Sequence, residues 1–361
     1  MGLKVLFLSH AFAPAIGGIE TVSKILADAF LQAGHEVRVM TATAGESTES
    51  AYPVIRKPSF REIVRQHAWA DVVFENNPCL RLGWAKMLFG KPSLVVLQTW
   101  VSRIDSDSHV AFSDKVRFRW LARANKVIAI SEAVRRKCWP QATVIHNSYD
   151  DQLFGILAQE RRQDFVFLGR LVSDKGAQLA VEAFGKLAFD SAVAGMENAR
   201  LTIIGDGPDR GALEALVAAM PDASRFRFIG PLNGNALVEE LNRHQFQFIP
   251  SIWEEPFGIV ALEGIACGLI PIASDGGGLP DAVGLAGVTF KRGQLDSLVA
   301  VTAQLLQSAE QQAKYRAAAP AHLIKFATAT ITRAYMLALE SIALPAGFNS
   351  RSTRGVSELV R

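Results

Sequence analysis

The segment Gln245–Asp281 constrains the fold of this chain more than any other part of the sequence. It begins with an apolar run that predicts a buried strand and continues through a loop into a helix that opens at Pro256–Gly258 and stops at Gly268. A second buried strand is expected at Leu269–Ser274, and the glycines Gly276–Gly278 follow it. Strand, loop, helix and strand with glycines at the loops make half of a doubly wound nucleotide-binding sheet. The free N–H groups and positive dipole at the start of such a helix suit a diphosphate.

Two acids, Glu255 and Glu263, bracket the start of this helix. On one continuous helix their spacing gives about 12 Å of rise and about 80° of rotation. The carboxylates of a glycosidase pair lie only about 5–9.5 Å apart, so the spacing argues against an acid/base pair across one bond. It better suits two anchors on one elongated ligand with a phosphate between them.

The sequence from Glu255 to Glu263, Glu-Pro-Phe-Gly-Ile-Val-Ala-Leu-Glu, is followed by Gly-Ile-Ala-Cys-Gly-Leu-Ile-Pro-Ile-Ala. Together they resemble the Glu-(seven residues)-Glu signature of retaining glycosyltransferase family 4. The resemblance implies that Glu255 touches the donor sugar and that Glu263 holds the nucleotide ribose. The alternative is that Glu263 is only a polar residue on a packed helix and Glu255 only a charge at its start.

Two cations follow the strand expected at Phe165–Leu168. Arg170 and Lys175 lie in a loop at the carboxyl edge of that strand, where ligands bind in open α/β sheets. An arginine fork and a lysine point charge can together hold a diphosphate. The family has both residues at matching spacing, as clamps on the leaving nucleotide diphosphate. Surface cations that cap a loop are the alternative.

The resemblance implies further donor contacts at glycine turns, at one backbone turn and at the start of the late helix. These residues are Gly17, Gly18, Gly169, Gly205, Pro231, Leu232, Phe257, Gly258, Ile259 and Val260. The pair Gly17-Gly18 follows a strand at Lys4–Ser9 and a loop too long for a dinucleotide fingerprint, so a plain helix-start turn explains it as well.

Three polar residues are candidates for the acceptor side. His10 follows the first strand and is either a ligand contact or an ordinary loop histidine. Gln98 stands where the family commonly has a histidine, and because glutamine cannot take a proton, a general base there is in doubt. His109, in a long polar loop, is a weak substitute. The same loop holds Asp105-Ser106-Asp107, which we interpret as a solvated turn. With cations and a helix start to neutralise the diphosphate, neither a divalent metal nor another cofactor is expected.

Charge is unevenly distributed along the chain. Residues 1–150 carry 19 Lys+Arg and 13 Asp+Glu, whereas residues 151–361 carry 19 and 22. A basic first half suits a phosphate-bearing acceptor or a membrane surface, although ordinary scatter explains it equally well. The helix expected at Lys115–Ala124 presents Arg117, Arg119 and Arg123 for phosphates, and Phe118 and Trp120 for a membrane, or it simply buries Trp120 and Leu121. No nucleic-acid partner is expected.

The location of the protein is expected to be cytoplasmic, with peripheral association at the inner face of a membrane as an option. No apolar run approaches the roughly 18 residues of a spanning helix, and Val5–Leu8 is too short for a signal-peptide core. Cys79, Cys138 and Cys267 are far apart and lack metal spacing, so they are expected to be buried in a reducing compartment.

These patterns predict an α/β protein of the GT-B type, two doubly wound parallel-sheet domains facing across a cleft. We place the domains at 1–155 and 156–327, with a helix from about 328 to 361 crossing back to the first. The expected function is retaining, metal-independent transfer of a hexose from a nucleotide sugar to a glycan or lipid-linked acceptor, in bacterial lipopolysaccharide or polysaccharide biosynthesis. UDP-glucose, UDP-N-acetylglucosamine, UDP-galactose and GDP-mannose all remain open as donors. A sugar-nucleotide epimerase of the same architecture and a non-catalytic nucleotide-sugar-binding protein are the alternatives.

Overall fold

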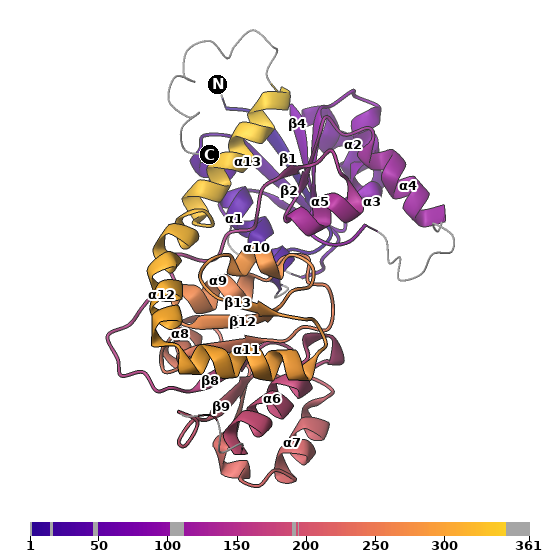
Figure 1. Ribbon diagram of the computed structural model, residues 1–361. Helices are drawn as coiled ribbons and strands as arrows, with labels where there is room; N and C mark the ends of the chain where they lie inside the picture. Colours follow the sequence, from indigo (N-terminus) through magenta and orange to yellow (C-terminus); the bar gives the residue numbers. More distant parts are fainter. Residues whose placement is uncertain are drawn as a thin grey trace. The chain divides into compact units, whose positions relative to one another are not determined.

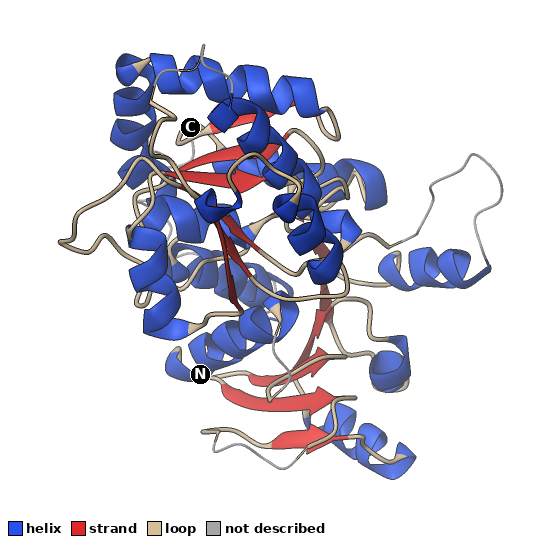
Figure 2. Cartoon of the chain, turned by 90° about the horizontal axis from the view of Figure 1, so that it is seen from below, coloured by secondary structure: helices blue, strands red, loops and turns tan. Residues whose placement is uncertain are grey.

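The computed structural model describes residues 2–14, 17–45, 50–101, 112–189, 193 and 195–343. The chain forms two compact units, and each is considered by itself. Unit 1 comprises Met1–Ile130, Val134–Ile145 and Ile331–Arg361, and unit 2 comprises Ser131–Ala133 and His146–Thr330. Each unit is built on one parallel sheet, and Figures 1 and 2 show the strands flanked by helices.

The division between the units falls after Ile145, earlier than the predicted position near residue 155. Hydrogen bonds explain the difference. The Thr328 hydroxyl donates to the carbonyl of Tyr149 over 3.0 Å, and the Thr328 N–H donates to the Asp151 carboxylate over 3.1 Å. These bonds tie residues 149–151 to the end of unit 2, so the polar stretch that suggested a linker follows a segment already held by unit 2.

Unit 1 has the strand order β3-β2-β1-β4-β5-β6-β7. Its strands are β1 (Lys4–Ser9), β2 (Glu36–Thr41), β3 (Val54–Arg56), β4 (Val72–Asn76), β5 (Ser93–Leu97), β6 (Lys126–Ala129) and β7 (Thr143–Val144). Its helices are α1 (Gly18–Gln32), α2 (Phe60–Trp69), α3 (Leu80–Gly83), α4 (Phe112–Leu121) and α5 (Glu132–Cys138), with the 3-10 helix η1 (Trp84–Met87). Every residue of β4 and β5 is buried, as expected for central strands covered on both faces.

Unit 2 has the strand order β10-β9-β8-β11-β12-β13. Its strands are β8 (Phe165–Leu168), β9 (Leu201–Ile204), β10 (Phe226–Gly230), β11 (Phe246–Ile249), β12 (Ile270–Ser274) and β13 (Val288–Phe290). Its helices are α6 (Ala177–Phe189), α7 (Arg210–Ala218), α8 (Gly234–Asn242), α9 (Ile259–Ala266), α10 (Leu279–Val283), α11 (Leu295–Gln307) and α12 (Ala309–Ile324), with the 3-10 helices η2 (Ser173–Lys175) and η3 (Ala223–Arg225). The last helix, α13 (Thr328–Ala343), begins in unit 2 and continues in unit 1.

Both sheets reverse their strand order once. In unit 1 the reversal lies between β1 and β4, and in unit 2 it lies between β8 and β11. The loops after the two neighbouring strands diverge at such a point and leave a crevice at the carboxyl ends, where ligands of doubly wound sheets bind. The topology therefore marks one candidate ligand edge in each unit.

The sequence pattern also predicts one helix at 78–89 and one at 321–342, and the structure interrupts both. The first is a short α3 followed by the tighter η1. The second consists of the end of α12 and most of α13, separated by residues 325–327. Phe326 explains this break, because its buried ring packs against His322, His146 and Phe257 and draws the chain off the helical path.

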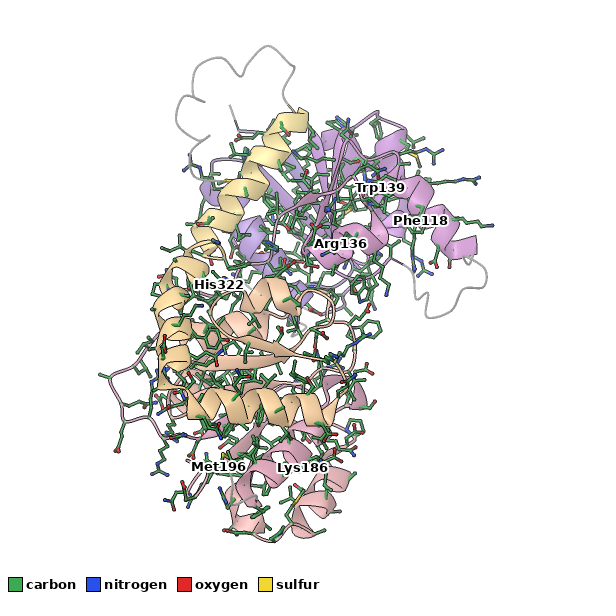
Figure 3. All side chains as sticks on the ribbon, in the orientation of Figure 1. Phe118, Arg136, Trp139, Lys186, Met196 and His322 are labelled. Carbon is green, nitrogen blue, oxygen red and sulfur yellow. The ribbon has the colours of Figure 1, made fainter. Side chains whose placement is uncertain are left out.

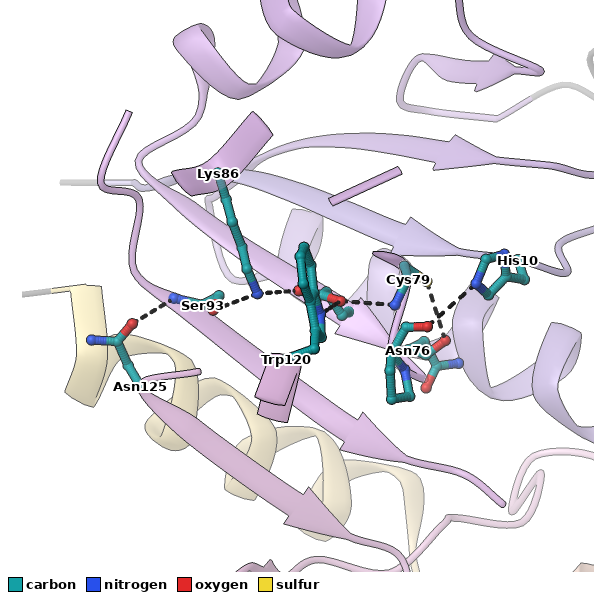
Figure 4. A network of polar contacts seen from close by, with 9 residues as sticks. His10, Asn76, Cys79, Lys86, Ser93, Trp120 and Asn125 are labelled. Atoms are coloured by element: carbon teal, nitrogen blue, oxygen red, sulfur yellow. Dashed lines mark hydrogen bonds and ion pairs between the residues drawn. The ribbon is translucent and has the colours of Figure 1, made fainter. Parts of the chain in front are cut away.

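The core of unit 1 contains an ion pair on its central strand (Figure 4). The Glu75 carboxylate on β4 and the Lys86 ammonium lie 2.5 Å apart, and both side chains are almost fully inaccessible to water. Glu75 also accepts hydrogen bonds from the indole N–H of Trp120 and the backbone N–H of Cys79, each over 2.8 Å. Lys86 donates to the Ser93 hydroxyl over 3.0 Å. The buried charges are thus paired and hydrogen-bonded, as low-dielectric surroundings require.

The hydrogen bond from Trp120 to Glu75 fixes which face of α4 packs against the core of unit 1. Trp120 and Leu121 are buried, so the alternative in which this helix buries both is confirmed, and Trp120 does not reach a membrane surface. Phe118, on the same helix, remains partly exposed (Figure 3). The prediction that all three cysteines are buried is confirmed. Among the described residues, no helix combines the length and the apolar character that crossing a membrane requires.

Candidate functional site

The strand reversal of unit 2 brings together the residues that the sequence pattern singled out. Arg170 and Lys175 lie in the loop after β8, and Glu255 lies in the loop after β11. The strands β8 and β11 are hydrogen-bonded neighbours, with Phe165 opposite Phe246. Residues 80 positions apart in sequence therefore meet at one end of the sheet.

A direct ion pair joins the two loops. The Lys175 ammonium donates to Glu255 Oε1, and the Ser251 hydroxyl donates to the same oxygen over 2.8 Å. Both charged side chains are mostly buried, whereas Arg170 is exposed at the same edge. Backbone bonds reinforce the junction, since the carbonyl of Asp174 accepts the N–H groups of Ile252 and Trp253. The cation and the acid are thus held in place before any ligand arrives.

Two glycines make this close approach of loops feasible. Gly176 has φ +68°, and a Cβ there would lie 2.0 Å from the carbonyl oxygen of Pro250. Gly277 has φ +65°, and its Cβ would lie 2.1 Å from the carbonyl oxygen of Glu255. That carbonyl also accepts the N–H of Gly278 over 2.7 Å. Only glycine fits at either position, because both the backbone conformation and the contact exclude a side chain.

The helix expected to face a diphosphate is α9. It begins at Ile259, after Gly258 in the left-handed conformation, so Glu255 lies in the preceding loop and not on a helix continuous with Glu263. The rise and rotation expected from the spacing of the two acids therefore do not apply. The ring of Phe257 is buried against His146. The first N–H groups of a helix lack intrahelical acceptors, so this end of α9 remains suited to an anion.

Glu263 lies on α9, one turn into the helix, and its side chain is largely buried but keeps some exposure to solvent. Burial, with a smaller contribution from the charge of Asp150, raises the pKa of Glu263 to about 7. A carboxyl group with this pKa changes its charge close to neutral pH, which is common at ligand sites.

The remaining donor-site predictions divide between the units. Gly169, Gly205, Pro231 and Leu232 lie at the ends of β8, β9 and β10 in unit 2, at the same edge as Lys175. Gly17 and Gly18 lie in unit 1, where Gly17 precedes α1 and its carbonyl accepts the N–H of Thr21 over 3.0 Å.

Two of the acceptor-side candidates lie near the strand reversal of unit 1. His10 follows β1, is exposed, and has its Nε2 3.4 Å from the carbonyl oxygen of Pro78 (Figure 4). Gln98 follows β5 and is buried, and its backbone N–H donates to the Asn77 side chain over 2.8 Å. His109 lies outside the described residues, as does Asp105-Ser106-Asp107. No group of three or more potential metal ligands occurs within the described part of the chain.

Several site residues were missed by the sequence reasoning. Ser251 bonds Glu255, Asp150 faces Glu263, and Asn77 links the ends of β4 and β5. Asn77 has φ +72°, a conformation in which asparagine is enriched, so the pair Asn76-Asn77 after an apolar strand was the available signal. No pattern in the sequence indicates the Ser251 contact, since it depends on how the loop folds.

Comparison with known proteins adds a family to this geometry. Residues 149–322 match the family model described as Glycosyl transferases group 1. This segment is similar to a group 1 glycosyltransferase domain and makes up a little under half of the chain. It contains the Arg170, Lys175, Glu255 and Glu263 positions described above.

The chain is also similar to an uncharacterised glycosyltransferase of Methanocaldococcus jannaschii. The two are 34% identical over 125 residues, which cover 35% of this chain and 30% of that protein. This chain thus spans about a third of the length of that relative. The GDP-mannose-dependent alpha-mannosyltransferase of Mycobacterium tuberculosis is 27% identical over 327 residues, which cover 78% of this chain and 82% of that protein.

The crystal structure of HepE from Anabaena in complex with UDP extends the similarity to both units. The alignment has a TM-score of 0.78 and 20% sequence identity, and it covers 94% of this chain and 100% of the HepE chain. The chain has the GT-B fold, in which two Rossmann-like domains are each built on a parallel sheet.

Proposed function

We propose that the chain is a retaining, metal-independent hexosyltransferase that uses a nucleotide-sugar donor. The observation that carries this proposal is the Lys175–Glu255 ion pair at the β8/β11 strand reversal. It places a cation for a phosphate beside an acid for a sugar hydroxyl. Arg170 and the start of α9 supply further positive potential at the same edge, so the leaving diphosphate can be neutralised by protein groups alone.

The proposed reaction proceeds on one face of the sugar. The bond from the anomeric carbon to the phosphate oxygen breaks, and a bond from that carbon to the acceptor hydroxyl oxygen forms. The proton of the acceptor hydroxyl passes to the departing phosphate oxygen, so no side chain has to act as a base. Catalysis then depends on positioning and on stabilisation of the leaving group. Glu263 binds the ribose, and His10 and Gln98 are proposed for the acceptor side.

We propose a glycan or lipid-linked acceptor from bacterial lipopolysaccharide or polysaccharide biosynthesis, and peripheral association of basic unit 1 with the inner face of a membrane. The excess of 19 Lys+Arg over 13 Asp+Glu in residues 1–150 supports both. The donor's base and sugar depend on loop geometry at the same edge, and UDP- and GDP-sugars are both candidates.

The function is tested by first screening nucleotide sugars for a rise in melting temperature. The stabilising donor is then incubated with a panel of lipid-linked and core-oligosaccharide acceptors. We expect acceptor-dependent release of nucleoside diphosphate and, by NMR, a product with the anomeric configuration of the donor. An inverted product rejects the mechanism. Turnover without an acceptor identifies an epimerase, and binding without release across the panel identifies a binding protein.

The raised pKa of Glu263 predicts that donor binding depends on pH. A carboxylate is a stronger acceptor for a ribose hydroxyl than a neutral acid, by roughly fivefold in affinity. Because the pKa of Glu263 is about 7, most of this gain falls between about pH 6 and pH 8, and we expect nucleotide-sugar affinity to rise by about threefold over that range. Titration calorimetry with an intact nucleotide sugar, whose phosphates stay ionised over this range, measures the effect.

The variant Glu263→Gln is the control, since it should bind more weakly and with no pH dependence. An unchanged pH profile in this variant contradicts the assignment. The raised pKa of Glu263 also affects the stability of the folded chain, which falls as the pH rises, whereas donor affinity rises. The folded chain retains a proton that the unfolded chain releases, so this contribution to stability is complete below about pH 4.5 and is lost as the pH rises through about 7.

A further inference from the structure

Unit 1 carries an exposed apolar cluster outside the sites described above, formed by Phe60, Trp84, Met87, Leu88 and Phe89. Phe60 begins α2, and its ring stacks on the partly buried Trp84 of η1 with centroids 4.8 Å apart. Figure 1 shows the neighbouring helices α2 and α3 that support it. Phe60 is 68% exposed, Leu88 65% and Met87 50%. Large apolar side chains seldom gather on a free surface unless the surface binds something.

The cluster is assembled from two neighbouring segments. Trp84 and Met87 are three residues apart in the 3-10 helix η1, which places them on the same face, and Leu88 follows Met87 directly. Phe60 extends that face from α2 through its stacking on Trp84. Phe89 and Gly90 form the turn after η1, and Phe89 is also exposed.

The two segments that carry this cluster are rich in positive charge. Within 57–65 and 81–91, the cations that are not fully buried are Lys57, Arg61, Arg65, Arg81 and Lys91. Glu62 is the sole acid in these two segments, and it forms an ion pair with Arg65 at 2.5 Å. The sixth cation, Lys86, is buried with Glu75.

We propose that this cluster is the face by which unit 1 docks on a bilayer containing anionic lipid. An apolar centre with a cationic rim suits such a surface, because the side chains enter the boundary between headgroups and acyl chains while lysine and arginine attract the anionic headgroups. Protein interfaces also use aromatic residues, methionine and arginine, so the test below includes the oligomeric state. The inference deepens the proposed membrane association of unit 1 and does not depend on sugar transfer.

The test is co-sedimentation of the full chain with vesicles of phosphatidylcholine, with and without about one-third phosphatidylglycerol. We expect the unaltered protein to bind the anionic vesicles and to dissociate as salt is raised. The double variant Phe60→Ser/Leu88→Ser should reduce partitioning by about tenfold or more. Leu88→Ser alone, which leaves the stacking of Phe60 on Trp84 intact, should give a smaller loss in the same direction.

The matched control is Leu285→Ser in unit 2, where the leucine is 77% exposed, and it should bind vesicles like the unaltered protein. The donor-induced rise in melting temperature should be the same in all variants, which keeps this test separate from that of the proposed function. The proposal is overturned if the unaltered protein binds no vesicles or if the cluster variants bind as well as the control. A dimer that the double variant converts to monomer also overturns it, because the cluster is then a protein interface.

Discussion

Replacing Lys175 with alanine should lower turnover of the nucleotide sugar by on the order of 10²-fold or more at saturating donor, and Arg170→Ala should act in the same direction. In the proposed reaction the leaving diphosphate gains negative charge in the transition state, and both cations follow β8 at the edge of unit 2 where we propose that it departs. Lys175 contributes twice, because it also pairs with Glu255. Its loss leaves that carboxylate bonded to Ser251 but without a cation.

Lys186→Ala is the matched control for this experiment. Lys186 lies on α6 of the same unit (Figure 3) and pairs with the exposed Asp296 over 2.9 Å. Removal of such a surface pair should leave turnover within about twofold of the unaltered protein. Measuring kcat and KM separately distinguishes lost leaving-group stabilisation, which lowers kcat, from lost binding. If both Lys175→Ala and Arg170→Ala match the control, the assigned roles are wrong.

Removing the buried cation of unit 1 should give the largest loss of stability. Lys86→Met leaves the Glu75 carboxylate inside the sheet without its counter-charge, and we expect the free energy of unfolding to fall by about 3–5 kcal/mol. Five of the six tryptophans lie in unit 1, so tryptophan fluorescence during urea unfolding reports mainly on that unit.

Two further variants complete this test. The double variant Glu75→Gln/Lys86→Met removes both charges and should recover much of the lost stability, since the cost comes from the unpaired ion. Lys24→Met breaks the exposed pair with Asp28 and should cost no more than about 0.5 kcal/mol. A Lys86→Met variant as stable as Lys24→Met would show that the pair contributes nothing to unit 1.

Local patterns predicted the strands well, because the central strands of a parallel sheet are short apolar runs that end at turn residues. The bounds of β1 and β8 agree with those expected from sequence. The break between α12 and α13 was missed because it depends on Phe326 packing against residues far away in the chain. The helical pattern of the residues on either side carries no sign of that contact.

The sequence predicted which residues form the candidate site, but not the contacts that join them. Arg170, Lys175 and Glu255 stood out as charged residues at loop positions, and the structure adds the ion pair that links the two loops. The raised pKa of Glu263 depends on its depth and on Asp150, which lies more than 100 positions earlier in the chain. The Glu75–Lys86 pair went unnoticed, although an acid inside the apolar strand Val72–Asn76 was a readable signal.

Gly176 and Gly277 bear on how mutational scans of this protein should be interpreted. A methyl group at either position collides with a main-chain oxygen of the same unit, so the damage needs no ligand. A screen that scores catalytic output alone would rank both glycines with the residues that touch substrate. Pairing each activity value with a measure of folded abundance separates the two groups, and libraries aimed at new donor preference should leave both glycines unchanged.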